Sequence, residues 1–256
     1  MRLLSYMSPG FPRSLFDALA AVIGAEVEFD ETQSGPAPGV DPFDAGEADL
    51  GWICSTSFVE LGTRGDDPSI ELTGVAWVPD DPDVNGRPVY FGDLVTLPDS
   101  GIRTFDDLRG KTIGCNDEVS LSGYHSWSFE LDDRELPDDF ATRVLTGGHH
   151  YSIDRLLAGE IDAALVDSVV RTARARADEA VADFHIIERL GPWPVQPLVA
   201  RSSMSADEIA RVRDLLLGAK DDPAVRAELD AACLTTLVEV GPDHYAPVRT
   251  AMERRA

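Results

Sequence analysis

Segments with the apolar pattern of strands alternate along this chain with segments of helical period. Residues 2–6 fit a strand, and apolar residues between 16 and 23 then recur at i, i+3, i+4 and i+7 until Gly24, as in a helix. Further strands are predicted at 25–29, 48–53 and 70–78, with a helix at 55–61. Because strands joined through helices usually pair in parallel, the alternation predicts an α/β fold with mostly parallel sheets.

A second series of the same kind lies between two extended runs, at 89–97 and 195–200. In it we expect helices at 104–108, from 122 onward, at 151–158 and at 169–182, and strands at 112–115, 141–145, 161–167 and 185–190, ended by the Gly-Pro-Trp-Pro at 191–194. Three helices, near 206–217, 223–232 and 245–254, end the chain after this series.

Two extended crossings around one α/β series predict two lobes joined by a two-stranded hinge. The predicted parts are a first lobe of 1–88 and 199–256, a second lobe of 96–191, and hinge crossings at 89–95 and 192–198. A ligand is expected in the cleft between them.

Composition excludes several classes of protein. The net charge of −24 would repel nucleic acid and anionic membranes, and no apolar run is long enough to span a bilayer. Only Lys111 and Lys220 are lysines, so the acidity fits either adaptation to high salt or a coding bias toward arginine. The three cysteines have no CxxC spacing, which argues against a disulfide framework or a zinc site, and no motif calls for a cofactor. The N-terminus lacks the pattern of a secretory leader, which predicts a cytoplasmic protein unless a leader has been removed, in which case it would be periplasmic or extracellular.

Small hydroxyl residues stand where a strand at 112–115 should turn into a helix. The segment is Ser120, Leu121, Ser122 and Gly123. The first N–H groups of a helix have no intrahelical acceptor and carry partial positive charge, so such a turn can hold an oxyanion. Serine is equally an ordinary N-cap, so this turn alone also fits a capped helix that binds nothing.

Several other short segments occur in a fixed order with that turn. They are GEADLGW at 46–52, PVY at 88–90, DSGI at 99–102, DLRGKT at 107–112, SLSGY at 120–124, TGGH at 146–149 and LAGEIDAA at 157–164. Each is weak alone, but in this order and spacing the chain resembles the phosphonate, phosphite and phosphate substrate-binding proteins of ABC transporters. The resemblance implies the two-lobed type II periplasmic-binding fold.

The resemblance also implies a set of ligand-binding residues. Ser120 and Ser122 would hold oxyanion oxygens together with the N–H groups of Leu121 to Gly123, and His149 would bind the same anion. From the first lobe, Tyr90, Ser55, Thr56 and Ser57 would contribute, and a polar pair, Asp167 and Ser168, follows the 161–167 strand. Leu121 and Ile53 replace polar residues of the family pattern, so the specificity for a phosphonate does not carry over directly.

We therefore expect a monomeric solute-binding protein that closes on a small oxyanion or phosphonate-like ligand, with an ABC permease as its partner. Two alternatives remain open. One is an enzyme on the same fold, similar to menaquinone-pathway dehydratases or thiamine-precursor synthases, and the other is a partner-binding module with a vestigial cleft. Neighbouring His149 and His150 point different ways with no third ligand at helical or strand spacing, which argues against a metal site. Cys54 has no base placed beside it by the sequence, which argues against a nucleophile.

Overall fold

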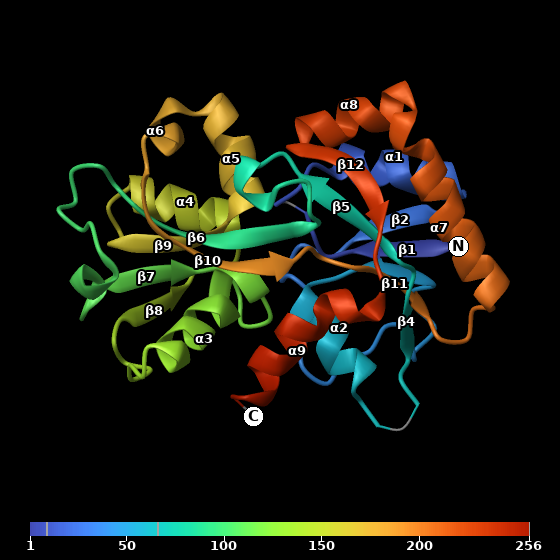
Figure 1. Ribbon diagram of the computed structural model, residues 1–256, viewed down its shortest axis with the longest axis horizontal. Helices are drawn as coiled ribbons and strands as arrows, with labels where there is room; N and C mark the ends of the chain where they lie inside the picture. The colour runs from blue at the N-terminus through green and yellow to red at the C-terminus, as the bar shows by residue number, and fades with distance from the viewer. Residues whose placement is uncertain (9, 66, 256) are drawn as a thin grey trace. The chain divides into compact units, whose positions relative to one another are not determined.

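The computed structural model describes residues 1–8, 10–65 and 67–255. They form two compact units, unit 1 of Met1–Val89 with Pro194–Ala256 and unit 2 of Tyr90–Trp193 (Figure 1). Each unit has its own β-sheet flanked by helices, which confirms the predicted α/β class. Tyr90, expected with the first lobe, lies in unit 2.

Unit 1 is built on a sheet of order β2-β1-β3-β11-β4, with a separate β12-β5 pair. Its strands are β1 Arg2–Ser5, β2 Glu26–Phe29, β3 Leu50–Trp52, β4 Ile70–Leu72, β5 Val75–Pro79, β11 Leu198–Arg201 and β12 Leu234–Glu239. Its helices are α1 Arg13–Ile23, α2 Ser55–Gly62, α7 Ala206–Gly218, α8 Pro223–Ala231 and α9 Ala246–Glu253, with 3₁₀ turns η1 Pro82–Val84, η4 Ala219–Asp221 and η5 Pro242–Tyr245. Strand β1 pairs in parallel with β2 and β3, whereas β11 runs antiparallel between β3 and β4.

An aromatic group fills the centre of unit 1. Trp52 stacks on Trp77 with ring centroids 4.8 Å apart, and Phe16 meets both edge-on. Phe16 comes from the buried face of α1, which the i, i+3, i+4 spacing predicts. This group joins strand β3 of the main sheet to β5 of the smaller one.

Unit 2 is built on a sheet of order β10-β6-β9-β7-β8. Its strands are β6 Val89–Thr96, β7 Thr112–Cys115, β8 Thr142–Leu145, β9 Ala163–Asp167 and β10 His185–Pro194. Its helices are α3 Ser126–Asp133, α4 His149–Leu157, α5 Ser168–Ala177 and α6 Glu179–Ala182, with a 3₁₀ turn η2 Phe105–Leu108 and a π-helical turn η3 Leu121–His125. Strand β7 is parallel to β8 and β9, and β6 is antiparallel to β9.

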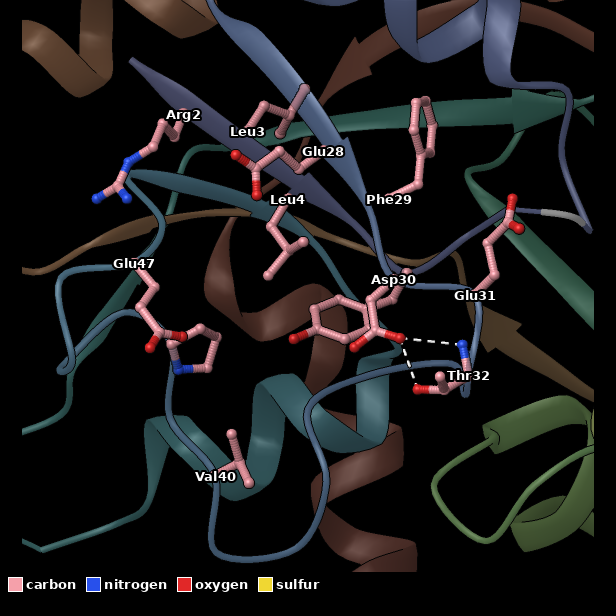
Figure 2. Close-up of a pocket in the computed structure, with 12 residues that line it drawn as sticks. Arg2, Leu3, Leu4, Glu28, Phe29, Asp30, Glu31, Thr32, Val40 and Glu47 are labelled. Carbon is pink, nitrogen blue, oxygen red and sulfur yellow. Dashed lines mark hydrogen bonds between the residues drawn. The ribbon is translucent and has the colours of Figure 1, made fainter.

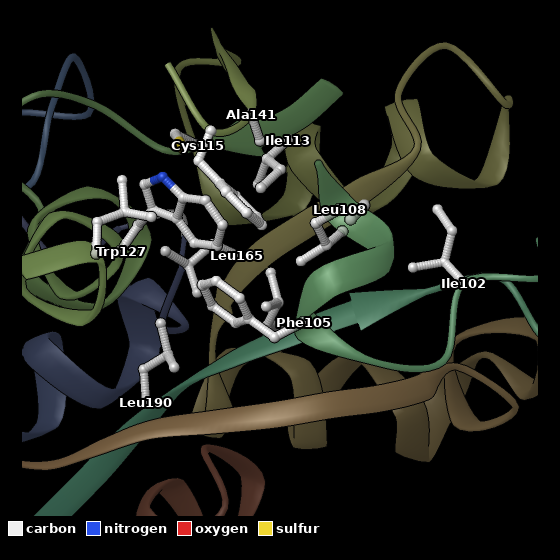
Figure 3. Packing of buried hydrophobic residues seen from close by; sticks show 13 residues of the cluster. Ile102, Phe105, Leu108, Ile113, Cys115, Trp127, Ala141, Leu165 and Leu190 are labelled. Atoms are coloured by element: carbon white, nitrogen blue, oxygen red, sulfur yellow. The ribbon is translucent and has the colours of Figure 1, made fainter. Parts of the chain in front are cut away.

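Two apolar clusters cover the two faces of this sheet. On one face, Leu165 and Ile113 pack with Phe105 and Trp127, whose rings stack 4.9 Å apart (Figure 3). On the other face, Val166 packs with residues of α4. Successive β9 residues therefore serve opposite cores, and burial on both faces explains the continuous apolar run of this strand.

A buried charge cluster ties β6 to α5 and β10. Asp93, which has no exposed surface, binds Arg171 of α5 at 2.6 Å and Arg189 of β10 at 2.8 Å. The guanidinium of Arg189 also lies over the Phe91 ring, 4.2 Å from its centroid. One carboxylate thus holds three elements of unit 2 together.

Three predicted elements differ in the structure, and one strand was missed. The strand predicted at 70–78 is two strands, β4 and β5, because Gly74 adopts a left-handed φ of +87° between them. The helix predicted at 169–182 breaks at Asp178, whose side chain caps α6. Strand β10 continues through the Gly-Pro-Trp-Pro segment that was expected to end it, and β12 was not predicted.

Candidate functional site

The candidate oxyanion site begins where β7 ends. The chain passes through residues 116–120 into η3, in which the His125 N–H donates to the Ser120 carbonyl at 3.0 Å, and α3 follows directly. The helical segment therefore opens at Leu121, one residue before the predicted start, and as a π turn. Such turns inside helices often mark functional sites.

The two serines of this turn have different hydrogen-bonding roles. Ser120 Oγ accepts the Gly123 N–H at 3.1 Å and so acts as the N-cap. The Gly123 N–H, which was predicted to bind the anion, is therefore already used within the turn. The Ser122 side chain is 2% exposed, and within the described residues its hydroxyl has no hydrogen-bond partner. The Ser122 hydroxyl therefore has an unused donor that a ligand could accept.

His149 lies against the same turn. It is the first residue of α4, after the Gly147-Gly148 turn, and a Cβ placed on Gly123 would lie 2.8 Å from its Cε1. Nδ1 of His149 accepts the Asp167 N–H at 3.3 Å, and its Nε2 lies 3.4 Å from Asn116 Nδ2. With Nδ1 as acceptor, the proton of the neutral ring is on Nε2, and this N–H needs an acceptor, so the Asn116 amide must turn its oxygen rather than Nδ2 toward it or give way to a ligand.

Burial, followed by the charge of neighbouring His150, lowers the pKa of His149 to about 3. At neutral pH the ring is therefore uncharged and acts as a hydrogen-bond donor without a positive charge. The site formed by His149 and η3 offers N–H and O–H dipoles to an oxyanion.

This pKa predicts an acid-sensitive contribution to stability. An unfolded histidine has a pKa of about 6.5, so between pH ~6.5 and ~3 the unfolded chain binds a proton that the folded chain does not. As the pH is lowered through that window, the free energy of unfolding should decrease. This group contributes up to about 1.4 kcal/mol per pH unit. We expect His149→Gln to reduce the slope in urea unfolding between pH 6.5 and 5, leaving the part from His244, whose pKa burial also lowers, whereas His185→Gln should leave the slope unchanged. An equal slope in wild type and His149→Gln would contradict the assignment.

The other predicted residues of unit 2 have structural partners. Asp167 Oδ1 accepts the N–H groups of Val169 and Val170 and caps α5, and Ser168 Oγ accepts the Phe91 N–H at 3.1 Å. Tyr90 is buried in β6. The structure thus groups Ser120, Ser122, Gly123, His149 and Asp167, and it ties Ser168 to β6.

In unit 1 the three predicted hydroxyl residues form the first turn of α2. Ser55 Oγ donates to the carbonyls of Pro194 and Val195, and Thr56 Oγ1 donates to Cys54 Sγ at 3.2 Å. Ser57 Oγ is buried and has no partner within the described residues. Of the three, Ser57 keeps the most hydrogen-bonding capacity for a ligand.

Two residues of the site were not predicted. Asn116, beside His149, follows β7 directly, and its place at the carboxyl end of a parallel strand could have identified it. Gly92 could not be found in this way, because its role is steric: a Cβ there would lie 2.6 Å from the Ser122 carbonyl oxygen. The close contact of β6 with η3 therefore requires glycine at this position.

Known structures resemble the whole chain. A binding-protein component of an ABC phosphonate transporter from Pseudomonas aeruginosa has a TM-score of 0.79 at 16% identity, over 98% of this chain and 85% of that one. PhnD1 from Prochlorococcus marinus, in complex with methylphosphonate, has a TM-score of 0.78 at 12% identity, over 100% and 97%. A Xanthomonas citri protein bound to chloride has a TM-score of 0.74 at 18% identity, over 99% and 97%. These likenesses confirm the two-lobed type II periplasmic-binding fold.

The sequence itself gives a more specific match. The family described as "ABC transporter, phosphonate, periplasmic substrate-binding protein" matches residues 13–245, nearly the full length. Its members are binding proteins, which supports the solute-binding interpretation over an enzyme on the same fold. No helix among the described residues is long and apolar enough to cross a membrane. The chain belongs to the family of periplasmic phosphonate substrate-binding proteins of ABC transporters.

Proposed function

We propose that this protein binds a small phosphonate or a related oxyanion at the η3 turn of unit 2 and delivers it to an ABC permease. The observation that carries the proposal is the unpartnered hydroxyl of Ser122 in the η3 turn, against which the neutral ring of His149 lies at Gly123. Both groups can donate to an anion without a change of protonation at neutral pH. Family membership and the methylphosphonate in a structural neighbour support the ligand class.

The strong negative charge of the chain does not exclude an anionic ligand. Repulsion from the net charge of −24 is screened beyond about 8 Å at physiological salt, whereas the donors of η3 act at contact distance. We expect the charge to slow association at low salt, and the donors to determine affinity.

The contacts of unit 1 belong to the same proposal. Ser57, with Ser55 and Thr56, would complete the site when the two lobes close about the crossings at 89–95 and 192–198. The protein would act as a monomer. The leucine at 121 removes a hydroxyl that the family pattern has, so the preferred oxyanion would differ from that of its relatives.

Thermal unfolding with and without candidate anions tests the proposal. At 100 times its dissociation constant, one of methylphosphonate, phosphite, phosphate or sulfate should stabilise the protein by about 2.7 kcal/mol. Ser122→Ala should weaken that anion about tenfold, since it removes one hydrogen bond to a charged group. Ser203→Ala, an exposed serine in unit 1, should leave affinity unchanged. A folded protein that none of the anions stabilises would overturn the proposal.

A further inference from the structure

A cavity with a volume of about 460 Å³ lies within unit 1 (Figure 2). It is lined by β1, β2 and the segment that follows β2. Leu4 of β1 pairs with Glu28 of β2, so alternate residues of both strands face the same side of the sheet. The volume is in the range of sites for small molecules.

Carboxylates dominate the polar lining of this cavity. Glu28, Asp30 and Glu47 line it, as does Glu31. Glu31 is already neutralised by Arg13 at 2.8 Å and accepts a hydrogen bond from Ser8. Glu28 and Glu47 form no ion pair within the described residues, and only Oδ1 of Asp30 is used, by Thr32.

The one cation of the lining does not balance these charges. Arg2 donates through its guanidinium to the Gly46 carbonyl, and its backbone N–H binds Asp49. Three carboxylates therefore share the cavity with one guanidinium that is bound to backbone. Together they favour a ligand that carries positive charge.

Tyr6 supplies an independent indication of a ligand. Its side chain is 5% exposed and lines the cavity, yet its hydroxyl makes no hydrogen bond within the described residues. Burial, then the charges of Asp30, Glu47 and Asp41, raise the pKa of this phenol well above its usual value. The neutral hydroxyl of this largely buried lining residue is therefore available to a ligand in the acidic cavity.

The remaining lining suits an organic cation better than a metal ion. Leu4 lies between Glu28 and Glu47, and Val40 adds apolar surface at the edge of the lining (Figure 2). Val40 is 48% exposed. No group of three or more His, Cys, Asp or Glu residues within the described chain could hold a metal. The charges are spread around apolar surface, as an ammonium on a methylene chain requires.

We propose that this cavity binds a small aliphatic amine, such as a diamine. Its ammonium groups bind Glu28, Asp30 and Glu47, Tyr6 accepts an N–H, and the methylene chain lies along Leu4 and Val40. This site is separate in residues and in ligand charge from the oxyanion site of unit 2, and the protein would then respond to two ligands.

Isothermal titration with 1,4-diaminobutane at about 0.15 M salt, where diffuse attraction is screened, tests the proposal. We expect saturable one-to-one binding, weakened tenfold or more by Glu28→Gln and by Tyr6→Phe. Asp17→Asn, which removes the same charge from an exposed position on α1, should leave affinity unchanged. Circular dichroism confirms folding, and Glu47→Gln replaces either variant that does not fold.

Two results would overturn the proposal. One is no saturable heat from a folded protein. The other is equal weakening by Glu28→Gln and Asp17→Asn, since this indicates general attraction of cations to an acidic surface. Because Ser122→Ala leaves the cavity intact, diamine binding in that variant separates the outcome from that of the oxyanion site.

Discussion

Replacing Gly123 with alanine is expected to weaken oxyanion binding by tenfold or more and to lower the free energy of unfolding by about 1–3 kcal/mol. The new Cβ would lie 2.6 Å from Cβ of Asn116, 2.8 Å from Cε1 of His149 and 3.0 Å from Oγ of Ser120. The Asn116 Cβ cannot move without its backbone, so the His149 ring and the η3 turn must separate. Titration with the anion that stabilises the wild type, together with urea unfolding, measures both effects.

Gly218 gives a matched control for this change. It ends α7, and a Cβ there would meet no atom within 4 Å. Gly218→Ala should stabilise the protein by up to about 1 kcal/mol, because alanine loses less backbone freedom in a helix, and should not change anion affinity. If both alanines act alike, steric contact at Gly123 does not position the site.

The change Asp93→Asn is expected to destabilise the protein by about 3–5 kcal/mol. It leaves the guanidinium groups of Arg171 and Arg189 without their shared counter-charge, in a place where the Asp93 side chain has no exposed surface. Urea unfolding followed by tryptophan fluorescence measures the loss. Trp127 and Trp193 are in unit 2, so its unfolding is visible.

An exposed ion pair shows whether burial is the cause. Glu60 of α2 pairs at 3.0 Å with Arg64, just beyond the end of that helix, and both side chains are exposed, so Glu60→Gln should change the free energy of unfolding by no more than about 1 kcal/mol. A triple variant with Asp93→Leu, Arg171→Met and Arg189→Met should recover much of the loss, since no buried charge is left unpaired. Equal effects of Asp93→Asn and Glu60→Gln would contradict this role of the cluster.

The elements predicted best are those whose residues decide the structure locally. The apolar spacing of α1 and the apolar run of β9 each specify one element, and both form. The missed strand β12 depends instead on pairing with β5, more than 150 residues earlier in the chain, which no local pattern reveals. The break at Asp178 follows from its capping side chain, a signal that was present but weaker than the helical period around it.

The candidate site shows the same limit at the scale of side chains. The sequence places Ser120 and Ser122 equally in the turn, but their hydrogen bonds differ: one caps η3 and the other keeps its donor. The protonated nitrogen of His149 is determined by the N–H of Asp167, eighteen residues away. Geometry between elements, which no spacing along the chain describes, decides these roles.

The position of β11 in the sheet of unit 1 also affects how the chain is made. The polypeptide leaves unit 1 after Val89, completes the whole of unit 2, and only then supplies the strand that lies between β3 and β4. At synthesis rates of about 5–20 residues per second, β3 waits on the order of ten seconds for this partner. The intervening unit can fold in that time, so the chain emerging from the ribosome would carry an ordered unit 2 after an N-terminal segment whose strand edges are still open to chaperones.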